Sequence, residues 1–168
     1  MAARERSILS VSSTVALAAI GLSLIIAASS AFAEVTVTQP WVRGTVPPQK
    51  ATGAFMTLRS TTNAKLVAAS SPTAIEVEIH EMAMINNVMR MRPVAGVALP
   101  AGKDVELRPG GYHIMLMGIK HQLKQGEVIP ITLTVQESDG KTHTIEVKAP
   151  VRDLTAPPPS QAMPHDRH

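Results

Sequence analysis

The sequence predicts an all-β protein, either an antiparallel sandwich or a barrel. Short runs of alternating apolar and polar residues are separated by turn residues, and no stretch keeps a helical period. In addition, Asp139-Gly140 stands between two β-branched runs, a pattern that favours a tight hairpin. Nine strands are expected, at Val35–Thr38, Ala54–Ser60, Lys65–Ser70, Ala74–His80, Val88–Val94, Lys103–Leu107, Tyr112–Met117, Val128–Gln136 and Thr142–Lys148.

The chain of 168 residues divides into three parts by composition. Residues 1–33 have two arginines, an apolar run and the small-residue triplet Ala31-Phe32-Ala33, and this order predicts a signal peptide cleaved before Glu34. An uncleaved membrane anchor is the alternative. Residues 34–154 are expected to form one domain, and the proline-rich residues 155–168 a flexible tail. Export predicts a periplasmic location.

Composition excludes several classes of function. The chain has no cysteine, which rules out disulfides, cysteine-ligated zinc, iron–sulfur clusters and thiol catalysis. The net charge is only +3 and the basic residues are scattered, so no nucleic-acid partner is expected. No nucleophile–base constellation is visible, so we expect neither an enzyme nor a substrate. Nine methionines and six histidines are the unusual feature.

The first informative histidine ends an alternating strand. In Ile75–His80 the odd positions are apolar and the even ones polar, which places His80 on the polar face. Met82 and Met84 have the same parity as His80. Because Glu81 interrupts the apolar positions, we expect the strand to end or bulge there.

A second histidine–methionine group has the same spacing. The aliphatic residues of its strand predict the buried face, so His113, Met115 and Met117 share the other face. A methionine on a polar face gains little from burial. Because the pairing of histidine with a methionine two residues later occurs twice, packing alone does not explain it. By contrast, Met89 and Met91 alternate with arginines, which predicts that these two methionines face the core.

A soft metal ion explains the pairing of these residue types. Thioether sulfur and imidazole nitrogen are neutral ligands, and soft sulfur selects Cu(I). Thiolates oxidise outside the cytosol, whereas thioethers resist oxidation better. A blue-copper centre is excluded because it requires a thiolate. The alternative is a metal-free β-sandwich module for adhesion or peptide binding, in which the methionines only fill gaps.

The spacing His80, ten residues, Met91, twenty-one residues, His113, one residue, Met115 resembles the signature of the PCuAC periplasmic copper chaperones. Further segments resemble that family, namely Trp41–Arg43, Gly53–Met56, Ile79–Met82, Met89–Pro93 and Pro109–Gly118. The resemblance implies a cupredoxin-like Greek-key barrel that holds one Cu(I) through those four residues. It also implies delivery to the copper centre of cytochrome c oxidase, alongside a Sco-type partner.

The C-terminal tail resembles the histidine- and methionine-rich extension of some members of that family. The extension implies a second copper site at Met163, His165 and His168, where imidazole favours Cu(II). A tail without function is the alternative. For the whole chain we expect a monomeric copper chaperone, and a copper-buffering or resistance protein is the competing hypothesis.

Overall fold

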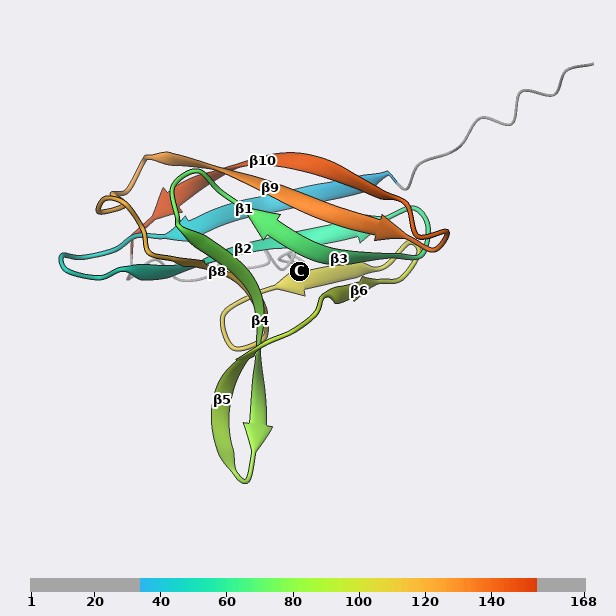
Figure 1. Ribbon diagram of the computed structural model, residues 1–168, viewed down its shortest axis with the longest axis horizontal. Helices are drawn as coiled ribbons and strands as arrows, with labels where there is room; N and C mark the ends of the chain where they lie inside the picture. The colour runs from blue at the N-terminus through green and yellow to red at the C-terminus, as the bar shows by residue number, and fades with distance from the viewer. Residues whose placement is uncertain (1–33, 154–168) are drawn as a thin grey trace, which may run out of the picture. The chain divides into compact units, whose positions relative to one another are not determined.

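The computed structural model describes residues 34–153, which form ten β-strands and, within that range, no helix (Figure 1). Nothing in this part of the chain is therefore a helix able to cross a membrane. The expected signal peptide and tail lie outside the described residues. The strands are β1 (Val35–Arg43), β2 (Ala51–Ser60), β3 (Ala64–Ser70), β4 (Glu76–Ile85), β5 (Val88–Pro93), β6 (Val97–Leu99), β7 (Asp104–Leu107), β8 (Tyr112–Met117), β9 (Val128–Glu137) and β10 (Thr142–Arg152).

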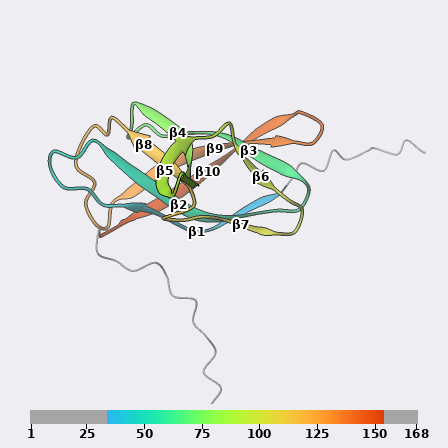
Figure 2. The ribbon, with the colours of Figure 1, turned by 90° about the horizontal axis from the view of Figure 1, so that it is seen from below.

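The strands are hydrogen-bonded in the order β5-β4-β8-β7-β2-β1-β10-β9-β3-β6, with a further pairing between β8 and β2. Most neighbours are antiparallel, as expected from the sequence, but β1–β10 and β7–β8 are parallel. The two halves of this order, β5 to β1 and β10 to β6, face each other as two layers joined through β1 and β10 (Figures 1 and 2).

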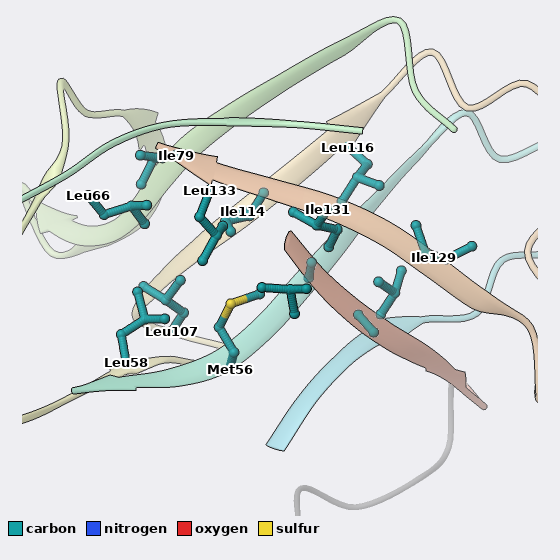
Figure 3. Close-up of a cluster of buried hydrophobic side chains, with 14 of the residues drawn as sticks. Met56, Leu58, Leu66, Ile79, Leu107, Ile114, Leu116, Ile129, Ile131 and Leu133 are labelled. Atoms are coloured by element: carbon teal, nitrogen blue, oxygen red, sulfur yellow. The ribbon is translucent and has the colours of Figure 1, made fainter. Parts of the chain in front are cut away.

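The space between the layers is filled by aliphatic side chains from both halves (Figure 3). Alternation along each strand supplies them: Ile114 and Leu116 of β8 point inward and meet Ile131 and Leu133 of β9. Each such side chain contributes about 1.5–3 kcal/mol when fully buried. Met56 belongs to this core, so at this position methionine is a packing residue.

A bulge in β1 changes which face its later residues occupy. Gln39 has a φ of 50°, and the register with β2 shifts between Thr38 and Trp41. The extra residue reverses the alternation. As a result Val42 enters the core, while Trp41 lies opposite Phe55 on the outer face of the sheet.

Strands β4 and β5 form a hairpin that extends beyond the other strands (Figure 1). The expectation that the strand ends or bulges at Glu81 was wrong, since β4 runs on to Ile85. Glu81 remains in the strand because its carboxylate accepts hydrogen bonds from Arg92 directly across the hairpin, the shorter at 2.6 Å. Asn86 and Asn87 close the hairpin, both with positive φ, as a two-residue type I′ turn requires.

The same extension overturns the expected burial of Met89 and Met91. The two side chains are 47% and 49% exposed, and all of β5 is exposed. The pairing of β4 with β8 ends at Glu81 and Tyr112, so from Met82 to Ile85 the described strand that pairs with β4 is β5. A methionine face opposite an arginine face therefore did not identify a core face here.

Candidate metal centre

Strand register brings the two predicted histidine ligands together. His80 of β4 is directly opposite His113 of β8, and their ring centroids are 5.9 Å apart. Both belong to the outer face of the sheet, yet they are only 8% and 5% exposed. Directly opposite residues have Cβ atoms about 4.5–5.5 Å apart, so the pairing alone places the rings side by side.

Met115 lies on the same face, one alternation beyond His113. Its partners in the neighbouring strands are Gly53 of β2 and Glu78 of β4. A side chain at Gly53 would collide with the Phe55 ring, at 2.7 Å from its nearest carbon. Glycine thus lets the aromatic ring fold over the backbone beside Met115 and His113.

Met91 reaches the site from the projecting hairpin. Its Sδ lies 3.1 Å from Nε2 of His113. A hollow of about 280 Å³ opens here, and Met91, His113, Met115 and also Met82 contribute to its wall. The structure therefore gathers three of the four predicted residues around one hollow, while His80 lies beside His113 and outside the lining.

The hydrogen bonding of His113 fixes its chemical form. Nδ1 lies 3.0 Å from the carbonyl oxygen of Gly111, which can only accept, so Nδ1 carries the proton. Burial lowers the pKa of His113; the hydrogen bond to Gly111 opposes this, and the charges of His80 and Arg43 add to it. In the neutral ring, Nε2 presents a lone pair to the sulfur of Met91. Two acceptors at 3.1 Å are stabilised by a cation that both can bind.

His80 is held by a carboxylate that sequence reasoning missed. Its Nε2 lies 2.6 Å from Oε2 of Glu78, and its buried Nδ1 has no hydrogen-bond partner. A metal-binding histidine commonly uses its second ring nitrogen for a carboxylate, which orients the ring. Glu78 precedes His80 by two residues on the same face, and this parity was the available signal.

Aromatic rings support the site from the side of β1 and β2. The rings of Trp41 and Phe55 are 4.5 Å apart between centroids, and Phe55 lies 6.3 Å from the His113 ring. The guanidinium of Arg43 lies over Phe55 at 5.5 Å. Both centroid distances fall within the range of about 4.5–7 Å for favourable ring pairs, so the row of rings packs against His113.

The remaining candidates are placed apart from the hollow. Met84 and Met89 lie near the tip of the hairpin, and Met117 lies farther along the outer face of β8. Residues 34–153 contain no group of three or more His, Asp or Glu side chains arranged to hold a metal. The proposed tail ligands Met163, His165 and His168 lie outside the described residues.

A family model described as "Putative lipoprotein LpqE-like" matches residues 35–151. The chain belongs to the LpqE-like family. A protein of Leifsonia xyli subsp. xyli, also described as a putative lipoprotein, is 36% identical over 124 residues, which are 72% of this chain and 71% of that protein. The lipoprotein description of the family indicates an exported protein.

Solved structures similar to this LpqE-like chain include PCuAC domains and DR1885. The apo PCuAC domain from PmoF1 aligns with a TM-score of 0.57 at 24% identity, covering 71% of this chain and 93% of that domain. Apo-DR1885 from Deinococcus radiodurans aligns with a TM-score of 0.54 at 28% identity, covering 92% of this chain and 98% of that protein. The Cu(I) form of DR1885 aligns with a TM-score of 0.51 at 32% identity, covering 76% of this chain and 85% of that protein. The expected cupredoxin-like β fold is confirmed.

Proposed function

We propose that this chain binds one Cu(I) ion through His80, Met91, His113 and Met115 and carries it outside the cytoplasm as a copper chaperone. One observation carries the proposal: the bare Nε2 of His113 faces the thioether of Met91 at 3.1 Å. A nitrogen about 2.0 Å and a sulfur about 2.3 Å from one metal ion can be this close to each other. The similarity to the Cu(I)-bound structure of DR1885 supports copper binding by this chain.

The choice of Cu(I) follows from the donor set and the charge around it. All four donor groups are neutral when the histidines are unprotonated, and thioether sulfur favours a soft ion. The guanidinium of Arg43 contributes to the wall of the hollow. A fixed positive charge there disfavours a divalent ion more than a monovalent one.

Unequal exposure of the ligands favours a carrier over a closed store. His113 is buried, whereas Met91 lies on an exposed edge strand at the rim of the hollow. A donor group from a recipient protein can approach Cu(I) at this rim and displace the Met91 thioether first. The ion then leaves by exchange of ligands, without oxidation or reduction and without unfolding of the sheet.

The recipient and the location are part of the proposal. By its resemblance to PCuAC chaperones, the chain would deliver copper in the periplasm to the copper centre of cytochrome c oxidase, with a Sco-type protein as partner. No catalytic role is proposed. The competing function is copper buffering without a dedicated recipient.

Transfer distinguishes these two functions. The Cu(I)-loaded protein is mixed anaerobically with the apo copper-centre fragment of the oxidase, and the metal content of each is measured after separation. We expect the copper to move to the fragment at a rate faster than its spontaneous release to a chelator of equal affinity. Equal rates would favour the buffering protein.

The tail adds a separate hypothesis. Met163, His165 and His168 would bind Cu(II), which prefers imidazole to thioether. A chain truncated after Leu154 should then keep its Cu(I) site and lose most of its Cu(II) binding. Equal Cu(II) binding by the full and truncated chains would leave the tail without this function.

A further inference from the structure

Methionine in this domain is concentrated on one surface. The described part of the chain contains seven methionines, and only Met56 is in the core. The other six all have the parity of the outer face of β4, β5 and β8, the face that carries His80 and His113. They are Met82, Met84, Met89, Met91, Met115 and Met117.

Four of these six form two cross-strand pairs in the β4–β5 hairpin. Met84 is directly opposite Met89, and Met82 is directly opposite Met91. Both pairs lie on the same face. The pair Met84 and Met89 is at the tip of the hairpin, and the pair Met82 and Met91 lies two residues closer to His113. Directly opposite side chains have Cβ atoms about 4.5–5.5 Å apart, so the two flexible thioethers of each pair can reach one ion.

Packing does not account for the pair at the tip. The side chains of Met84 and Met89 are 63% and 47% exposed, so within residues 34–153 this end of the hairpin is left largely uncovered. The opposite face of the hairpin carries arginines, one of which is paired with Glu81, and at the tip it carries the exposed pair Ile85 and Val88. Exposed apolar side chains at the tip are thus not confined to methionine, and sulfur is what distinguishes the methionine face. A hairpin that needed only solubility would carry polar residues on both faces. Two opposed, exposed thioethers are instead a neutral, soft pair of ligands.

We propose that Met84 and Met89 form a second, weaker Cu(I) site at the hairpin tip, from which the ion passes along Met82 and Met91 to His113. This inference rests on the proposed Cu(I) site and adds its loading route. At each step between methionines one copper–sulfur bond forms as another breaks, and at the last step a copper–nitrogen bond to Nε2 of His113 forms as the bond to Met82 breaks. Copper remains Cu(I), and neutral thioethers release no proton. The tip site is weaker because it has two thioethers, no imidazole and open contact with water.

Methionine methyl signals test the order of binding. The full chain, labelled with ¹³C at the methionine methyl groups, is titrated anaerobically with Cu(I). We expect the methyls of Met91 and Met115 to shift with the first equivalent and those of Met84 and Met89 with the second. The core methyl of Met56 should not respond to either equivalent.

The outcomes separate the two proposals. If Met91 and Met115 respond and the tip pair does not, the loading route is wrong while the main site stands, and the tip is better explained as a protein-contact surface. If neither Met91 nor Met115 responds, the proposed function itself fails and the route fails with it. A tip pair that shifts before the inner methyls, at less than one equivalent, would overturn the claim that it is the weaker site.

A double variant tests the route by its effect on rate. Leucine is close to methionine in volume, so Met84→Leu with Met89→Leu should leave the fold intact. We expect loss of the second bound equivalent, unchanged affinity for the first, and slower loading from a Cu(I)–chelator complex. The matched control is Met117→Leu, on the same face of the sheet but away from the hairpin. Loading and stoichiometry equal to those of the control would overturn the route.

Discussion

Nε2 of His113 lies 3.1 Å from Sδ of Met91, although the two residues belong to strands that are separated by β4. Neighbouring strands are about 4.8 Å apart, so a flat sheet would hold β5 and β8 nearly 10 Å apart. The contact is therefore made across β4, by two long side chains that lie on the same outer face. The site depends on the path of the β4–β5 hairpin as much as on the identity of the ligands.

The exposed ligand is the first target for mutation. Met91→Leu removes the sulfur but keeps the apolar volume, so we expect a large loss of Cu(I) affinity in a chelator competition. Stability should change by no more than about 0.5 kcal/mol, because the side chain is exposed. The matched change Met117→Leu should leave affinity nearly unchanged. Equal losses in the two variants would mean that the ligands are misassigned.

The turn that closes the hairpin gives a second prediction. Asn86 and Asn87 both have positive φ, which costs alanine about 1–2 kcal/mol per residue. Replacing both by alanine should loosen the hairpin and lower Cu(I) affinity through Met91, although neither asparagine is a ligand. Replacing both by glycine should preserve affinity. Chelator competition measures the Cu(I) affinity, and the methyl signal of Met91 reports the loosening of the hairpin. Unchanged affinity in the alanine variant would contradict a role of the turn in positioning Met91.

Much of the fold could be predicted because alternation is a local property. The strand Tyr112–Met117 was predicted with its observed bounds, and the Asp139-Gly140 turn joins β9 and β10 as expected. Strand β6 was not predicted, since three residues carry too little pattern. The reversal at Gln39 was also not predictable, because a bulge breaks the very alternation on which the prediction relies.

The candidate site shows the same division. Parity placed His80, His113 and Met115 on one face, and the structure shows them on that face. It could not show that the hairpin projects past the second layer, so Met91 was expected in the core. Alternation also did not identify Glu78 as part of the site. A carboxylate on the polar face of a strand is common, and only the structure shows that this one is bonded to His80.

The hydrogen bond between Glu78 and His80 leads to a third prediction. Glu78→Gln removes the carboxylate charge that orients the ring, and loss of such a partner typically lowers metal affinity about 10–100-fold. Glu76→Gln is the control, because Glu76 lies on the same strand and face but is opposite Met117. Cu(I) affinity of the two variants is compared by chelator competition. A loss in the control as large as that in Glu78→Gln would indicate a general electrostatic effect.

The pH dependence follows from the neutral state of His113. Burial lowers its pKa in the folded protein below the ordinary value of 6.5. Protons therefore compete for Nε2 only at a pH lower than for an exposed imidazole. We expect Cu(I) affinity to stay constant from pH 8 to about 6.5 and to weaken only below the folded pKa. Chelator competition across this pH range measures the Cu(I) affinity, and an NMR titration of the His113 ring measures its pKa. Affinity that does not change down to about pH 5 would argue for an all-methionine site.

The same shift affects the stability of the metal-free protein. The unfolded chain binds a proton at His113 more readily than the folded chain does. The contribution of neutral His113 to the free energy of unfolding is therefore fully present above about pH 6.5. This contribution is lost as the pH falls from 6.5 through the pKa of His113 in the folded protein. The free energy of unfolding in urea is measured at pH 7.5 and at pH 5. The difference between the two values should be smaller for His113→Gln than for the unmodified protein.

The central claim is a single Cu(I) held by both nitrogen and sulfur from His80, Met91, His113 and Met115. X-ray absorption of the protein loaded anaerobically with one equivalent of Cu(I) tests it most directly. The account predicts a Cu(I) edge and a first shell that contains both light nitrogen scatterers and sulfur, with the sulfur contribution reduced in Met91→Leu. A shell without sulfur, or one of sulfur alone, would contradict it.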